Sequence, residues 1–314
     1  MTLANPPAFA IPVLLLLFRR PDTSRRILDR LRLLRPTHLV VVADGPRGDV
    51  PGEGRLCQAA RRELGRIDWP CRVERLFSAT NLGIAASLDL GMRHVFRSHE
   101  RVIVLEDDCL PDPSFFSFCA ELLERYADTE RVMAIAGSNL GVGIQPEGGS
   151  YAFSRYQLLW GWATWKRAWR HQDMAMGQWP ARAAAGWLDT VLETPQARRY
   201  WCYHFRTNHR TAENWDYAWT FNCWRRDGLC IHPAVNLVRN LGFREDATHT
   251  ALASSPGAQL EAHALPFPLV HPPAVRRDAE RDRCVEAQAY SGPEFLAPLF
   301  RSIRHHLHPS GPRA

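Results

Sequence analysis

Short apolar runs without polar alternation recur through the first 140 residues of the chain. Such runs are typical of strands buried on both faces of a parallel sheet. Segments with helical spacing of apolar residues separate them, as at Ile27, Leu28 and Leu31. Strands that alternate with helices predict an α/β fold with a mostly parallel central sheet flanked by helices. The predicted strands are Ile11–Phe18, His38–Ala43, Cys71–Phe77, Val102–Leu105 and Val132–Ala136.

The pattern changes after about residue 140, where glycine, proline and tryptophan become frequent. Asn214 is a suitable N-cap for a helix over 215–226, and Leu229–Val235, interrupted by Pro233, predicts an edge or late strand. We therefore expect one domain over 9–250, with its two halves over 9–140 and 141–250, and a C-terminal extension over 251–314 that is partly irregular.

Three carboxylates directly follow the apolar run Val102–Leu105. They are Glu106, Asp107 and Asp108, and Asp112 then caps a helix that begins at Pro113. An unpaired buried carboxylate is very costly, so the triplet must meet water, a cation or a basic partner. A divalent metal with a diphosphate is one interpretation, because α/β sheets bind ligands at the carboxyl ends of their strands. A solvated acidic turn is the other.

Other polar residues fall at the ends of predicted strands. Arg20 is either a solvated residue at a helix start or a contact to a phosphate or base. Asp44, before Gly45, is either the acceptor of an Asx turn or an acceptor for a nucleobase N–H. Asn81 and Gly83 open a helix, whose N-terminus suits an anion or an ordinary cap. Their shared position at one sheet edge favours a nucleotide site there.

A tryptophan-rich segment contains Trp160, Trp162 and Trp165. These rings suit either core packing or a stacking wall for sugar rings. Gly161, between the first two, would permit the close approach of a ligand or backbone.

Asp216 lies in the first turn of the helix that follows Asn214, where the helix dipole favours a charged carboxylate. Next to an acceptor hydroxyl it would act as a general base; otherwise it complements the helix dipole. His249 is a possible metal or diphosphate ligand, although a single histidine is more often structural.

The composition of the chain limits the classes of ligand that it is expected to bind. The formal net charge is +6 and Lys166 is the only lysine, so the basic residues are almost all arginines, which bind phosphate and carboxylate groups in a bidentate manner. No nucleic-acid-binding signature is present. The apolar run Ile11–Phe18 has no basic segment before it and is shorter than a membrane span. We expect a cytoplasmic protein that is able to contact the inner face of the membrane peripherally.

Taken in order, these motifs resemble the GT-A glycosyltransferases, in particular bacterial proteins related to N-acetylglucosaminyltransferase I and the family 2 enzymes. The resemblance spans roughly residues 11–250. It rests on Glu106-Asp107-Asp108 with Pro113 and Phe115-Phe116, on Leu159-Trp160-Gly161-Trp162, on Trp215-Asp216, and on the segments 236–243 and Thr248-His249.

The resemblance implies a GT-A fold and a metal-dependent, inverting glycosyltransferase, in which 9–140 is the nucleotide-binding half and 141–250 is the acceptor half. Its donor would be a nucleotide-diphosphate sugar, with UDP-sugars favoured. Its acceptor would be the hydroxyl of a glycan or lipid-linked sugar, as in the synthesis of cell-envelope polysaccharide. The implied roles are Mn²⁺ or Mg²⁺ binding by Asp108, in a DXD-like motif, with His249; nucleotide binding by Arg20, Asp44, Asn81, Glu106 and Asp107; base catalysis by Asp216; and acceptor binding by Trp160, Trp162 and Trp215.

One segment departs from the pattern. Many relatives carry a basic residue near the position of Gly83–Ser87, and this chain has none there. Arg155 or Lys166 would have to supply the missing diphosphate contact. Two further functions fit the sequence less well. A sugar-phosphate nucleotidyltransferase needs a glycine-rich basic loop after the first strand, and a non-catalytic carbohydrate-binding protein leaves the acidic triplet without a purpose.

Overall fold

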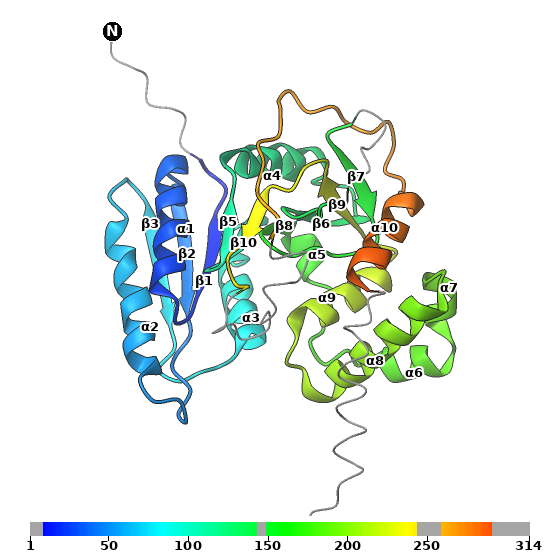
Figure 1. Ribbon diagram of the computed structural model, residues 1–314, viewed down its shortest axis with the longest axis horizontal. Coiled ribbons are helices and arrows are strands. Elements are labelled where there is room, and N and C mark those ends of the chain that lie inside the picture. The colour runs from blue at the N-terminus through cyan, green and yellow to red at the C-terminus, as the bar shows by residue number, and fades with distance from the viewer. Residues whose placement is uncertain (1–8, 143–148, 244–258, 291–314) are drawn as a thin grey trace, which may run out of the picture.

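The computed structural model describes residues 9–142, 149–243 and 259–290. Its main element is an eight-stranded sheet with the strand order β3-β2-β1-β4-β8-β6-β9-β7 (Figure 1). The strands are β1 (Val13–Leu17), β2 (His38–Ala43), β3 (Arg72–Phe77), β4 (Arg101–Glu106), β6 (Val132–Ala136), β7 (Tyr151–Ser154), β8 (Trp162–Trp165) and β9 (Leu229–Pro233). Two further strands, β5 (Cys109–Pro111) and β10 (Val238–Asn240), form a separate antiparallel pair.

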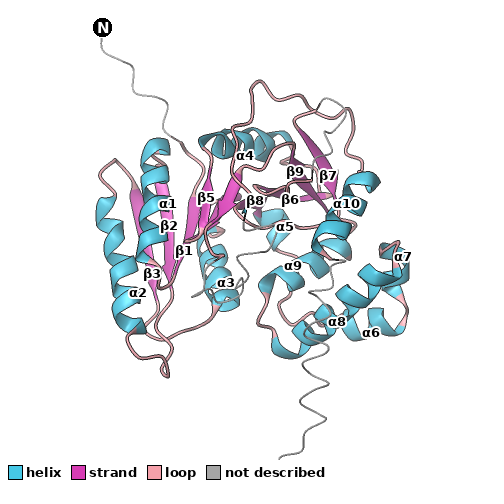
Figure 2. Ribbon diagram, in the orientation of Figure 1, coloured by secondary structure: helices cyan, strands magenta, loops and turns pink. Residues whose placement is uncertain are grey.

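Helices cover both faces of the sheet (Figure 2). The longer helices are α1 (Pro21–Leu34), α2 (Glu53–Arg62), α3 (Ile84–Val95), α4 (Pro113–Arg125), α8 (Pro195–Thr211), α9 (Trp215–Trp224) and α10 (Ala279–Ala289). Four shorter ones are α5 (Lys166–Trp169), α6 (Trp179–Ala184), α7 (Trp187–Val191) and the 3₁₀ helix η1 (Glu63–Arg66). No helix in the described ranges has the length and apolar character needed to cross a membrane.

The predicted α/β architecture is confirmed. β1 pairs in parallel with β2 and β4, and β2 pairs in parallel with β3. Alternate residues of β1 enter different cores: Leu14 and Leu16 belong to the core that also contains residues of α3, α8 and α9, whereas Val13 and Leu15 belong to the core that also contains residues of α1 and α4. This double burial explains why the strand sequences show no polar alternation.

The second half of the sheet was predicted less completely. β8 runs antiparallel to both β4 and β6, and β7 runs antiparallel to β9. β9 is not an edge strand, because β6 and β7 flank it and Pro233 stands at its last position. The elements β5, β7, β8 and α8 were not predicted, because most of these segments are short and pair with residues far away in the chain.

Helix α10 is attached to the sheet by a buried polar network. Asp282, which is 2% exposed, accepts hydrogen bonds from the Ser154 hydroxyl and the Arg155 backbone N–H and forms an ion pair with Arg277. Glu286, one turn further along, accepts a hydrogen bond of 2.8 Å from the Tyr156 hydroxyl. The extension beyond residue 250 therefore contributes a helix to the main body.

We predict that Asp282→Ala lowers the free energy of unfolding by roughly 2–4 kcal/mol, because buried donors and two arginines lose their acceptor. Urea denaturation followed by circular dichroism measures this change. Glu280→Ala, at an exposed position of the same helix, is the control and should change stability by less than about 0.5 kcal/mol. Equal stability of the two variants would contradict the anchoring role of Asp282.

Candidate functional site

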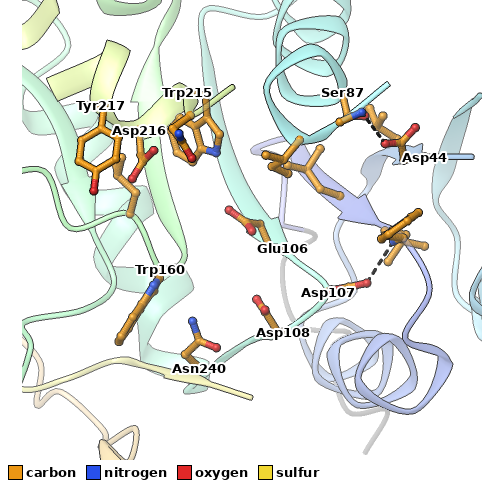
Figure 3. A pocket seen from close by; sticks show the side chains of 18 of the residues that line it. Asp44, Ser87, Glu106, Asp107, Asp108, Trp160, Trp215, Asp216, Tyr217 and Asn240 are labelled. Atoms are coloured by element: carbon orange, nitrogen blue, oxygen red, sulfur yellow. Dashed lines mark hydrogen bonds between the residues drawn. The ribbon is translucent and has the colours of Figure 1, made fainter. Parts of the chain in front are cut away.

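A cavity of about 650 Å³ lies at the carboxyl ends of β1, β2 and β4, where it also meets α9 and the end of α10. Figure 3 shows the acidic residues Glu106 and Asp108 on one side, with Trp160, Trp215, Asp216 and Tyr217 across from them. The lining includes Arg20, Asp44, Asn81, Glu106, Asp107, Asp108, Trp160, Trp215 and Asp216 from the predicted site. It also includes Arg47, Ser87, Ser138, Gln157, Asn214, Tyr217, Asn240 and Tyr290.

The acidic triplet occupies the turn where β4 ends. The Asp107 carboxylate points back to β1 and accepts a hydrogen bond of 3.1 Å from the Phe18 backbone N–H (Figure 3). Arg20 lies between the two aspartates, with its Nη1 atom 2.6 Å from Asp108 and 3.5 Å from Asp107. The triplet thus faces both a basic partner and an open cavity.

Crowding of these carboxylates changes their protonation. Burial, followed by the charges of Asp108 and Asp107, raises the pKa of Glu106 well above its usual range, and the charge of Asp216 adds to this. Burial and the neighbouring Asp108 raise the pKa of Asp107 to about 7, although Arg20 acts in the opposite direction. Neighbouring carboxylates repel each other when both are charged, so they resist simultaneous ionisation. A cation in the cavity would relieve that repulsion.

The chemistry of these donors fits a divalent cation, because Mn²⁺ and Mg²⁺ prefer carboxylate oxygen ligands. Asp108, which we expected to bind the ion, lines the cavity together with Glu106 and Asp107. Among the described residues, however, no three acidic, histidine or cysteine side chains already form a set of metal ligands. His249 lies outside the described residues.

The strand pair β5–β10 brings a second segment against the triplet. The Leu241 backbone N–H donates to the Asp108 carbonyl at 2.7 Å, and the Gly242 N–H donates to Asn240 Oδ1 at 2.6 Å. A Cβ atom on Gly242 would lie 2.3 Å from Asp108 Oδ2. The absence of a side chain at Gly242 is therefore what allows this segment to approach the acidic turn.

Asp44 organises the loop that begins at Asn81. Its two carboxylate oxygens accept hydrogen bonds from the backbone N–H groups of Gly45, Leu82 and Gly83 and from the Asn81 amide, at 2.8–2.9 Å. These four bonds use the accepting capacity of a carboxylate. To bind a nucleobase, Asp44 would have to exchange one of them, so its recognition of a base stays a prediction.

The three tryptophans that we expected to bind an acceptor differ in position. Trp160 is partly exposed and lines the cavity, and Trp215, although only 5% exposed, also lines it. Trp162 is fully buried and stacks on Trp215 with ring centroids 5.3 Å apart. The acceptor-binding role expected of Trp162 is therefore wrong, because its ring packs in the core behind Trp215.

Gly161 adopts a φ of 58°, which favours glycine. The group that approaches it is the Val238 side chain, which would lie 2.8 Å from a Cβ atom at this position. The close approach expected here is thus made by the protein itself.

Asp216 is exposed in the first turn of α9 and points into the cavity beside Trp215 and Tyr217 (Figure 3). Its charge is one cause of the raised pKa of Glu106, which places the two carboxyl groups within electrostatic reach of each other. A carboxylate and a carboxyl cluster therefore face the same space.

Two polar atoms that the sequence analysis did not single out also face this space. Ser87 Oγ and Gln157 Oε1 are buried and lack a hydrogen-bond partner within the described part of the chain, and both residues line the cavity. Buried polar atoms normally have partners, so these two are available to a ligand. Tyr290 was also missed, because its position depends on how α10 packs.

Arg155 and Lys166, which we expected to supply the missing diphosphate contact, do not lie at the cavity. Arg155 pairs with Asp282, Lys166 pairs with Glu100, and neither lines the cavity. Arg47 lines it instead, held by Glu53 with Nη2 2.6 Å from Oε1. Arg47 lies in the loop between β2 and α2, where nothing in the sequence marked it as a site residue.

No protein-family model matches the chain, and no curated protein matches it. Several solved structures resemble part of it. The mannosyltransferase PcManGT from Pyrobaculum calidifontis, in complex with GDP-Man and Mn²⁺, aligns with a TM-score of 0.37 and 16% identity over 54% of this chain, and the chain spans about half of that protein (48%). A cytidylyltransferase from Leptospira borgpetersenii aligns with a TM-score of 0.30 and 10% identity over 65% of this chain and 73% of the other. HddC from Yersinia pseudotuberculosis aligns with a TM-score of 0.28 and 12% identity over 46% and 62%.

The raised pKa of Asp107 predicts a pH dependence of stability in the metal-free protein. Between its ordinary value of 3.8 and about 7, the folded state holds a proton that the unfolded state has lost. Stability should therefore fall as pH rises through this window. We expect Asp107→Asn to reduce the loss between pH 5 and pH 8 by roughly 1–3 kcal/mol.

Urea unfolding at several pH values, with EDTA present throughout, measures this effect. Asp49→Asn, at an exposed loop position, is the control and should keep the wild-type pH dependence. If the free energy of unfolding of Asp107→Asn changed with pH in parallel with that of the wild type, the Asp107 carboxyl group would not be the source of the pH dependence.

Proposed function

We propose that the protein is a metal-dependent, inverting glycosyltransferase that uses a nucleotide-diphosphate sugar. The observation that carries this proposal is the placement of Asp216 across one cavity from the carboxyl cluster Glu106–Asp108. A sugar transferase needs a place for a charged diphosphate leaving group and a base for the acceptor hydroxyl. The two sides of the cavity offer one of each.

On this proposal Asp108 holds Mn²⁺ or Mg²⁺, with His249 as a further ligand, and the ion would neutralise charge on the departing diphosphate. Glu106 and Asp107 support the nucleotide, together with Arg20, Asp44 and Asn81. Arg20, now paired with Asp108, would exchange this contact for one to the donor. UDP-sugars are the favoured donors.

Asp216 acts as the general base. The acceptor oxygen attacks the anomeric carbon, the bond from that carbon to the diphosphate oxygen breaks, and the hydroxyl proton passes to the Asp216 carboxylate. The nucleoside diphosphate leaves, and the configuration of the sugar is inverted. Trp160 and Trp215 offer aromatic surface to the acceptor, a glycan or lipid-linked sugar.

A sugar-phosphate nucleotidyltransferase is the second candidate. It lacks support at the turn after β1, where Arg19 and Arg20 lead into Pro21, the first residue of α1, without a glycine. A carbohydrate-binding protein without catalysis would not need the acidic turn. A screen of nucleotide sugars, run beside a screen of nucleoside triphosphates with sugar 1-phosphates, each with and without EDTA, separates the three. Release of nucleoside diphosphate from a nucleotide sugar supports glycosyl transfer, and release of pyrophosphate from a nucleoside triphosphate and a sugar 1-phosphate supports nucleotidyl transfer. Thermal stabilisation by glycans alone supports binding.

We predict that Asp108→Ala lowers metal-dependent release of nucleoside diphosphate by roughly 10²–10³-fold or more, because charge stabilisation on the leaving group is lost. Asp112→Ala is the matched control. Asp112 caps α4 by accepting from the Ser114 N–H at 2.9 Å, so its loss should cost about 1 kcal/mol of stability and leave turnover intact. Full activity of a folded Asp108→Ala protein would overturn the metal assignment.

We further predict that Asp216→Asn lowers the rate of sugar transfer by roughly 10²–10⁴-fold while binding of the nucleoside diphosphate with Mn²⁺ is unchanged. Calorimetry measures the binding and product analysis measures the transfer. Glu213→Gln, just before the same helix and exposed, should retain both properties. Wild-type transfer by Asp216→Asn would exclude Asp216 as the base.

A further inference from the structure

Helices α6, α7 and α8 enclose a second cavity of about 420 Å³, in the helical group that lies apart from the sheet in Figure 1. Its base is apolar, because Trp179 and Leu188 are almost fully buried there. The exposed ring of Tyr203 stands at its wall. The remaining lining residues are Ala183, Gly186, Asp189, Arg198, Arg199, Cys202 and Arg206.

The polar part of this cavity carries excess positive charge. Arg198 Nη1 lies 3.3 Å from Asp189 Oδ1, and Arg198 also donates to the Leu192 carbonyl at 2.8 Å. These two charges therefore compensate each other. Arg199 and Arg206 have no carboxylate partner among the residues that the structure describes. The Arg206 Nη2 atom donates a weak hydrogen bond to Cys202 Sγ at 3.6 Å.

Some exposed arginines elsewhere in the protein are already neutralised by a carboxylate. Arg25, Arg66 and Arg93 pair with one at 3.1, 2.7 and 2.6 Å. Two guanidinium groups without such a partner, both lining one cavity, leave a net charge of about +2. That charge matches a phosphate group, which guanidinium forks bind through paired, charge-assisted hydrogen bonds.

Helix geometry holds the two groups on the same side. Arg199, Cys202, Tyr203 and Arg206 follow each other at spacings of three and four residues, which places them on one face of α8. Another side chain of α8, Tyr200, has its hydroxyl 3.1 Å from the hydroxyl of Tyr217, which lines the first cavity. One helix therefore separates the arginine-lined cavity from the candidate active site.

We propose that the cavity between α6, α7 and α8 binds a phosphate group carried by an organic molecule, with Arg199 and Arg206 as its ligands. The apolar base and the Tyr203 ring accept the carbon part of that molecule. This proposal does not rest on the function of the first cavity. The phosphate belongs either to a phospholipid headgroup or to a small phosphorylated molecule, and the two sources are separable by experiment.

Thermal unfolding in phosphate, compared with chloride at equal ionic strength, tests the site. The double variant Arg199→Gln/Arg206→Gln should need about tenfold more phosphate, or still more, for the same stabilisation, because two charge-assisted contacts are lost. Ala183→Phe fills the cavity, leaves both arginines in place and should have a similar effect. Arg210→Gln is the control, since Arg210 is exposed on the same helix but does not line the cavity.

Phosphate stabilisation that is the same in all four proteins, or is missing from the wild type, would overturn the proposal. So would an equal loss in Arg210→Gln, because it would indicate unspecific attraction to a basic surface. Sedimentation with phosphatidylglycerol vesicles, with phosphatidylcholine vesicles as reference, then identifies the carrier. Vesicle binding that needs both arginines assigns the phosphate to a headgroup, and phosphate binding without it assigns a small phosphorylated molecule.

Discussion

Repulsion among carboxylates at the end of β4 is the constraint around which the cavity is arranged. The strand is buried on both faces, so its last residue and the two that follow arrive together at one edge of the sheet. Arg20 from the neighbouring strand end supplies one positive charge, and the Phe18 N–H supplies a donor. The raised pKa values of Glu106 and Asp107 indicate that this compensation is incomplete without a further cation.

The two halves of the sheet meet at the same place. β4 is parallel to β1 on one side and antiparallel to β8 on the other. Local chain order therefore builds the wall with Asp44 and the triplet, whereas distant segments build the wall with Trp160 and Asp216. The segment that contains Gly242 packs against Asp108, so residues more than 130 positions apart in the sequence are in contact at the acidic turn.

The sequence was most informative where neighbouring residues decide the structure. Buried strands of aliphatic residues, the cap at Asp112 and the positions of the triplet and Asp216 all follow from local patterns. Tertiary contacts decided the rest. Trp162 and Trp160 have the same local character, yet only one faces the cavity, and Tyr290 enters it through the packing of α10. Ser87 and Gln157 became notable only once their lack of partners was visible.

The attachment of α10 has a consequence for how the protein forms during synthesis. β1–β4 and their helices use only residues from the first part of the chain, so their pairing can begin before the later strands are synthesised. The cavity wall at Tyr290 and the partners of Asp282 become complete only when the ribosome has released residue 290. A nascent chain would therefore expose the acidic turn on a formed half-sheet well before the opposite wall covers it.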